Sequence, residues 1–208
     1  MLYPVNQYFL LGLATFIIVG VLTPIMRRIA INKGVVDQPN AAHKTHKEAV
    51  PYLGGVAIVI GVVVVATGAL VVKDFSAKNF WLATSVLLPA IAMAIMGLID
   101  DVQGLAPWPR LFVQTLTGTI VAGILILSDT IGTPAHNVLI DAVVSIIWIV
   151  GITNSINFFD NLDGGAAGAI AAASVFTFLI AYYEGQILVS ALAIVIAGAM
   201  FGFLIWNK

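Results

Sequence analysis

The chain has 208 residues, of which 61% are hydrophobic and only 9% are charged, and its mean hydropathy is +1.06. An ordinary soluble domain carries about 25% charged residues. So few polar groups could not cover a water-soluble globule, which excludes that class of protein. The formal net charge of -1 argues against a nucleic-acid-binding protein, and the lack of cysteine excludes disulfides and thiolate metal sites.

Seven apolar runs have the length of about 20 residues that a helix needs to cross a bilayer. In chain order they cover residues 6–26, 51–72, 80–99, 111–128, 138–156, 164–183 and 187–206. Because membrane strands alternate in hydropathy and these runs do not, we predict an all-α polytopic membrane helix bundle, one integral membrane domain over residues 1–208. The first run lacks the basic leading region of a signal peptide and is interpreted as a span. The small residues of 164–174 predict close helix packing rather than phosphate binding.

The charges between these runs predict the orientation of the chain. If the spans alternate, one side of the membrane receives segments 27–50, 100–110, 157–163 and 207–208. These segments hold seven of the nine basic residues, namely Arg27, Arg28, Lys33, Lys44, Lys47, Arg110 and Lys208. By the positive-inside rule this side is the cytoplasm, so we expect a multi-pass protein of the inner (plasma) membrane with its N-terminus outside.

The first cytoplasmic segment is longer than a plain connector. Its residues Lys44, His46 and Lys47 are suited to supply positive charge to a phosphate-bearing substrate. Gly54 and Gly55 would let backbone amides approach that substrate at the start of the second span. The alternative is a basic loop that follows the topology rule and contacts anionic lipid, and this loop taken alone favours it.

The second segment contains two adjacent carboxylates, Asp100 and Asp101, at the end of the third span. They repel each other and lie at the negative end of the helix dipole, which is unfavourable unless a cation or water compensates. Mg²⁺ commonly takes one or two carboxylates together with substrate phosphates and water. The pair therefore predicts a Mg²⁺ site, with a solvated pair as the alternative.

The third segment places Asn154, Asn157, Asp160 and Asp163 at a spacing of three residues. On a helix this spacing puts them on one face at the end of the fifth span, where they could bind ribose, a base or a metal. The alternative of equal weight is a turn that ends the fifth span and starts the sixth at Gly164.

All three polar segments lie on the same predicted side of the membrane. A channel or ion-coupled transporter would instead keep ionisable groups near the middle of the bilayer, and no internal repeat supports a transporter. The placement favours an enzyme that joins a charged cytoplasmic donor to an acceptor embedded in the membrane.

These segments carry motifs of a known family. The motif residues are Asp37, Pro39, Asn40, Lys44, His46, Pro51, Gly54 and Gly55 in the first segment, Asp100, Asp101, Arg110 and Gln114 in the second, and Asn157, Asp160, Asp163 and Gly164 in the third. With them the whole chain resembles the polyprenyl-phosphate N-acetylhexosamine-1-phosphate transferases of glycosyl transferase family 4, relatives of phospho-MurNAc-pentapeptide translocase. It departs from the usual family pattern at His43, Asn161 and Gly165. Family members continue beyond the point that corresponds to its end, so we expect an N-terminal fragment that is inactive alone.

The resemblance implies transfer of a sugar-1-phosphate from a UDP-sugar to undecaprenyl phosphate, which yields a lipid-linked diphosphate sugar and UMP and initiates synthesis of an envelope polysaccharide such as lipopolysaccharide or teichoic acid. The first-segment pattern favours UDP-GlcNAc among UDP-N-acetylhexosamines. Mg²⁺, with Mn²⁺ as an alternative, would be the cofactor, and a homodimer is left open. The implied site residues are Asp100 and Asp101 as catalytic, the same pair with Asp160 as metal ligands, and Lys47, His46, Asn157, Asp160 and Asp163 as substrate-binding. The alternatives are a non-catalytic homologue that binds lipid phosphate, and a membrane transporter.

Overall fold

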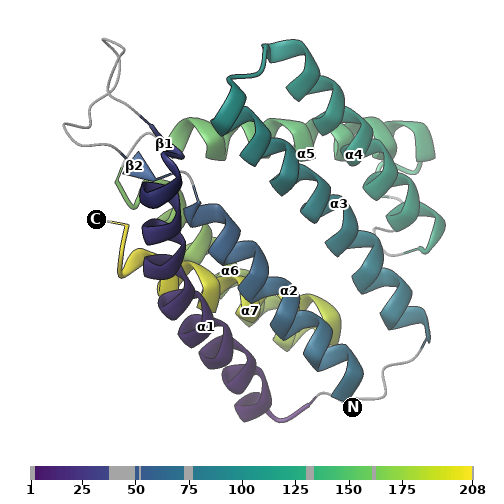
Figure 1. Ribbon diagram of the computed structural model, residues 1–208. Coiled ribbons are helices and arrows are strands. Elements are labelled where there is room, and N and C mark those ends of the chain that lie inside the picture. Colours follow the sequence, from purple (N-terminus) through teal and green to yellow (C-terminus); the bar gives the residue numbers. More distant parts are fainter. Residues whose placement is uncertain are drawn as a thin grey trace. The chain divides into compact units, whose positions relative to one another are not determined.

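The computed structural model describes residues 3–37, 50–51, 53–72, 77–129, 134–160 and 163–207. Seven helices dominate this part of the chain (Figure 1), and all seven are long and apolar enough to cross a membrane. The helices are α1 (Val5–Lys33), α2 (Gly54–Val72), α3 (Ala77–Gln103), α4 (Pro107–Leu127), α5 (Val138–Phe159), α6 (Gly165–Tyr183) and α7 (Ile187–Leu204). The predicted all-α class is therefore confirmed, and the chain is a multi-pass membrane protein.

Two features at the helix ends differ from the predicted spans. Both α1 and α3 continue past their apolar runs, because a helix needs apolar side chains only where it meets lipid. A short antiparallel pair also follows α1, formed by β1 (Val36–Asp37) and β2 (Val50–Pro51). Composition did not indicate this pair, which closes the base of the first polar segment.

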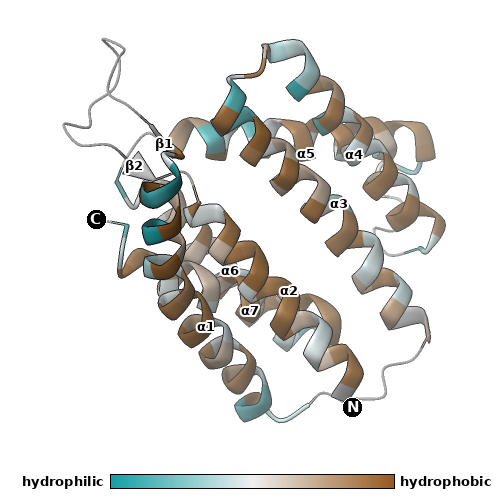
Figure 2. Ribbon diagram, viewed as in Figure 1, coloured by the Kyte–Doolittle hydropathy of each residue, from teal (hydrophilic) through white to brown (hydrophobic). Residues whose placement is uncertain are grey.

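The chain forms two compact units. Unit 1 comprises Met1–Ser76 and Phe159–Lys208 and contains α1, α2, α6 and α7, whereas unit 2 comprises Ala77–Phe158 and contains α3 and α4 and nearly all of α5. Within each unit, hydrophobic residues cover most of the helix length and hydrophilic residues gather toward the ends (Figure 2). Large apolar side chains stay exposed, among them Val21 of α1 and Trp148 of α5. Such exposure is expected where lipid, not water, surrounds the helices.

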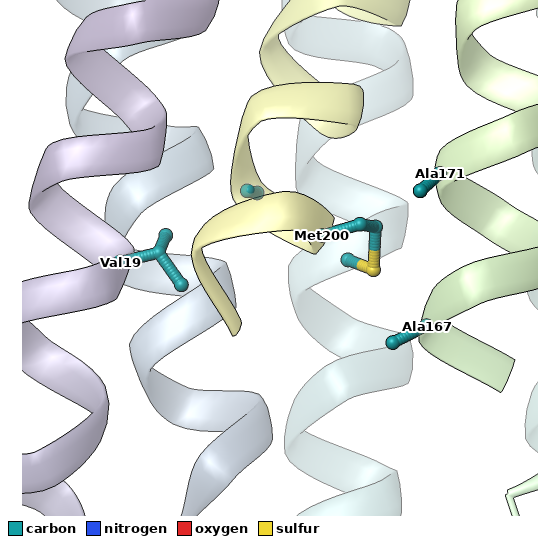
Figure 3. Packing of buried hydrophobic residues seen from close by; sticks show 5 residues of the cluster. Val19, Ala167, Ala171 and Met200 are labelled. Atoms are coloured by element: carbon teal, nitrogen blue, oxygen red, sulfur yellow. The ribbon is translucent and has the colours of Figure 1, made fainter. Parts of the chain in front are cut away.

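In unit 1, α7 packs against α1, α2 and α6. Its Met200 meets Ala167 and Ala171 of α6 in a buried cluster that also includes Val19 of α1 (Figure 3). The prediction that 164–174 packs closely against other helices is thereby confirmed.

Glycines bring α1 and α7 into contact. A Cβ atom built on Gly198 would collide with the backbone of Gly12, and one on Gly202 would lie 2.5 Å from the carbonyl oxygen of Phe16. Membrane helices gain little from hydrophobic burial against each other, so they associate through the van der Waals contacts that small residues permit. The α1–α7 contact thus requires glycine, which has no side chain, at these two positions of α7.

A side chain after α7 compensates for a proline in α1. Pro24 has no N–H, so it cannot donate the helical hydrogen bond to the carbonyl of Gly20. The indole Nε1–H of Trp206 donates to that oxygen at 2.8 Å. In lipid an unsatisfied carbonyl is costly, so this contact secures both the α1 backbone and the end of α7.

We predict that Gly198→Ala destabilises the protein, because the new methyl group forces α1 and α7 apart. Overpacking of this kind costs about 1–3 kcal/mol. The control is Gly68→Ala in α2, where an added Cβ meets no atom within 4 Å. Thermal unfolding in detergent should show a lower midpoint for the first variant and an unchanged or higher one for the second. Equal midpoints would contradict the close α1–α7 packing.

We also predict that Trp206→Phe lowers stability by about 0.5–1.5 kcal/mol, the net value of one hydrogen bond. Pro24→Ala restores the N–H that Gly20 lacks, so Trp206→Phe should cost less in that background. The four midpoints of this double-mutant cycle check the prediction. Additive effects of the two substitutions would show that the indole does not serve the carbonyl released by proline.

Candidate functional site

Asp100 organises the connection between α3 and α4. It lies in the last turn of α3, and its side chain is 19% exposed. Its Oδ1 accepts a hydrogen bond from the N–H of Leu105 at 2.9 Å, and its backbone carbonyl accepts one from the N–H of Gly104 at 2.7 Å. Gly104 has a φ of 65°, a left-handed conformation that glycine adopts without steric cost. Asp100 therefore fixes the turn that ends α3.

Arg110 is the second partner of the same carboxylate. Its Nη1 donates to Asp100 Oδ2 at 2.9 Å, and the two form an ion pair. Arg110 lies in the first turn of α4, where the helix dipole disfavours a cation, just as the end of α3 disfavours an anion. The short connection brings the two ends together, so each charge compensates the other.

Asp101 differs from its neighbour in exposure. It is the next residue of α3, about 100° further around the helix, and its side chain is exposed to solvent. The two carboxylates that look equivalent in the sequence thus occupy different surroundings. One contributes to the turn, and the other is accessible to ligands.

A buried amide connects α4 to α5. Gln114 lies one turn beyond Arg110, and its Oε1 accepts a hydrogen bond from Nδ2 of Asn154 at 2.7 Å. The same Nδ2 also donates to the carbonyl of Val150 at 2.8 Å. Asn157 follows Asn154 by three residues and shares its face of α5. This bridge therefore orients the face on which Asn157 lies, and Asn157 itself is exposed.

The predicted alignment of the third polar segment is correct for its two asparagines and wrong for its two aspartates. The helix α5 ends at Phe159, Asp160 lies in the following turn, and Asp163 lies in the turn at Gly164. Gly164 has a left-handed φ of 66° and caps α6, which the alternative interpretation of a turn anticipated. Nearby protein atoms partly desolvate Asp160 and raise its pKa, although the residue keeps contact with solvent.

The predicted metal ligands lie in both units. Asp100 and Asp101 belong to unit 2, whereas Asp160 belongs to unit 1. Among the described residues, no group of three histidine, aspartate or glutamate side chains is close enough to hold one metal ion. Mg²⁺ needs only one or two carboxylates when water and substrate phosphate complete its shell. Asp101 has an exposed carboxylate, whereas both oxygens of Asp100 accept hydrogen bonds, from Leu105 and Arg110.

The first polar segment is described only at its ends. Lys44, His46 and Lys47 lie outside the described residues, and their roles stay predictions. A Cβ on Gly54 would approach the ring of Phe203 to 2.8 Å, so any other residue there would displace this ring of α7. At Gly55 an added Cβ meets nothing within 4 Å, which leaves its backbone open.

Sequence reasoning assigned no task to Arg110 or Gln114 beyond their places in a family motif. Their spacing of four residues puts them on one face of a helix, a signal that was available. Residues 104–106 connect the two helices, so the end of α3 that carries Asp100 lies close in sequence to the start of α4 that carries Arg110. The direction of each side chain, however, depends on the packing of α3 and α4.

Comparison with known proteins identifies relatives over most of the chain. A family model described as glycosyl transferase family 4 matches residues 83–208. The probable undecaprenyl-phosphate N-acetylglucosaminyl 1-phosphate transferase of Bacillus subtilis is 31% identical over 204 residues, which cover 96% of this chain and 54% of the relative. The decaprenyl-phosphate N-acetylglucosaminephosphotransferase of Mycolicibacterium smegmatis is 30% identical over 98% of this chain and 54% of the relative. A phospho-N-acetylmuramoyl-pentapeptide-transferase of Staphylococcus saprophyticus is 27% identical over 94% of this chain and 65% of the relative. The chain thus spans about half to two thirds of the length of these relatives.

The hydrogen bonds of the α3–α4 turn predict that its two aspartates affect stability differently. Asp100→Ala removes the acceptor for Leu105 and leaves Arg110 without its carboxylate, a loss of about 1–3 kcal/mol. Asp101→Ala should lower the thermal midpoint less, because its side chain is exposed. Unfolding of both variants in the same detergent compares them. A larger loss for Asp101→Ala would contradict the assignment of Asp100 to the turn.

Proposed function

Because the chain belongs to glycosyl transferase family 4, we propose that it takes part in transferring a sugar-1-phosphate from a UDP-sugar to a polyprenyl phosphate at the cytoplasmic face of the membrane. The printed names of its relatives support the general reaction, since they describe transferases that use undecaprenyl or decaprenyl phosphate. We propose UDP-GlcNAc as the donor and undecaprenyl phosphate as the acceptor. The enzyme would reside in the inner membrane with its N-terminus outside, as the basic segments favour.

The observation that carries this proposal is the polar chemistry at the meeting ends of α3 and α4 and on the adjoining end of α5. Carboxylates, a guanidinium and amides gather at the ends of helices whose other surfaces are apolar. A lipid phosphate has its chain in the bilayer and its charged head at the surface. Helix ends at the membrane surface would present polar groups at the depth of that head group.

In the proposed reaction an oxygen of the acceptor phosphate attacks the sugar-bearing phosphorus of the donor. A new P–O bond forms, the diphosphate bond breaks, and UMP leaves with the electron pair. The attacking phosphate is mostly ionised at neutral pH if its second pKa is near 6, as for other monoesters. The protein therefore needs no dedicated base, and its tasks are positioning and charge stabilisation.

Two negatively charged substrates repel each other, so the site needs cations. Bound Mg²⁺ would neutralise the donor diphosphate, with Mn²⁺ as a substitute. Asp101 would hold that ion through its exposed carboxylate. On the nucleotide side, the amide of Asn157 would donate hydrogen bonds to the uridine or accept them from it, and the carboxylate of Asp163 would accept them.

The basic residues Lys47 and His46 would contact the donor phosphates. Both come from the first polar segment, in the part of the sequence between β1 and β2.

We predict that membranes containing the intact protein transfer labelled sugar phosphate from UDP-GlcNAc to undecaprenyl phosphate only when Mg²⁺ or Mn²⁺ is present. A panel of UDP-sugars identifies the donor. Asp101→Asn should reduce turnover about a hundredfold or more, as expected when a group that stabilises the reacting charge is lost. The control is Asp129→Asn, an exposed aspartate in a turn with a φ of 54°, which asparagine also tolerates. Unchanged turnover of Asp101→Asn would contradict the metal assignment, and absence of transfer from every donor would contradict the proposed function.

A further inference from the structure

The guanidinium of Arg110 has more hydrogen-bonding capacity than its protein contact uses. An arginine side chain carries five N–H donors. One of them, on Nη1, is engaged by Asp100 at 2.9 Å, and the side chain is 32% exposed. The group is therefore held on one side and accessible on another. Arginine binds phosphate through paired N–H groups, so a held and accessible guanidinium is suited to an oxyanion.

The location of Arg110 requires an explanation. It lies in the first turn of α4, where the dipole is positive and a cation is unfavourable. Asp100 offsets part of that cost, but Asp100 could satisfy the turn through Leu105 alone. A second anion at the exposed side of the guanidinium would complete the compensation.

The surroundings of Arg110 point to the same ligand. Gln114, on the same face of α4, reaches Asn154, and Asn157 lies on the face of α5 that this bridge orients. Asp101 lies next to Asp100 at the end of α3. Within unit 2, Arg110 is thus placed among the residues that the proposed function assigns to metal and nucleotide.

We propose that Arg110 binds a phosphate oxyanion of a substrate and that Asp100 is a positioning residue which holds its guanidinium in place. The proposal rests on the proposed function and assigns different roles to the two adjacent aspartates. Asp100 acts through Arg110 and the turn, whereas Asp101 is the residue proposed to hold Mg²⁺. The oxyanion belongs either to the donor diphosphate or to the acceptor monophosphate, which share this chemistry.

A double-mutant cycle tests the proposal in the intact protein at saturating Mg²⁺. Arg110→Gln should raise KM for one phosphate substrate about tenfold or more, the value of a charge-assisted hydrogen bond, with a smaller change in kcat. The substrate whose KM rises, UDP-GlcNAc or undecaprenyl phosphate, identifies the source of the oxyanion. Asp100→Asn should raise the same KM, and the double variant should be no worse than Arg110→Gln alone. Arg110→Lys keeps the positive charge but lacks the paired N–H donors of the guanidinium, so it should give an intermediate KM.

The matched control is Arg28→Gln, an exposed arginine on α1 that should leave both KM values unchanged. Multiplied effects in the double variant, or a changed Mg²⁺ requirement in Asp100→Asn, would overturn the positioning role. Unchanged KM values in Arg110→Gln would overturn the phosphate site.

Direct binding separates this inference from the proposed function. If the wild-type protein binds UDP-GlcNAc or undecaprenyl phosphate without transferring sugar phosphate, the proposed function fails, but weaker binding by Arg110→Gln still supports the phosphate site. Equal binding by Arg110→Gln and the wild-type protein, or no binding of either ligand by the wild-type protein, would overturn it.

Discussion

A lipid bilayer supplies no hydrogen-bond partners, so every polar group inside it must be satisfied by the chain itself. The pairing of Trp206 with the Gly20 carbonyl that Pro24 leaves free is a direct result. The hydroxyls of Thr15 and Thr23 obey the same constraint by donating to carbonyls of their own helix. Among the described residues, charged side chains lie near the helix ends or in the connections between helices, and that placement decides where a charged substrate can be handled.

The two units stabilise their helices in different ways. In unit 1, half of the spanning window of α7 is buried, and contact between bare backbones at Gly198 and Gly202 holds α1 against it. In unit 2, polar contacts also connect the helices, through the ion pair of Asp100 with Arg110 and the amide bridge to α5. The residues that resemble a catalytic site thus also contribute to the fold.

Hydropathy and length predicted all seven spans, because the requirement of about 20 apolar residues is strict and local. The helix ends were less predictable, since helical hydrogen bonds continue into water wherever the backbone allows, as at the end of α3. The spacing of Asp160 and Asp163 was compatible with a helix as well as a turn. In the structure α5 ends at Phe159 and Gly164 is left-handed, so the two aspartates lie in turns. The three-residue spacing of the polar side chains could not predict either feature.

The aspartate pair shows what a motif cannot specify. Adjacent residues of a helix point about 100° apart, so two identical carboxylates can have different partners, and only the packing of α3 with α4 shows which one meets Arg110. Asp100 pairs with Arg110, whereas Asp101 is exposed at the negative end of the α3 dipole. A carboxylate at this helix end attracts a cation, and the neighbouring guanidinium attracts an anion, which is the combination that a metal-bound phosphate requires.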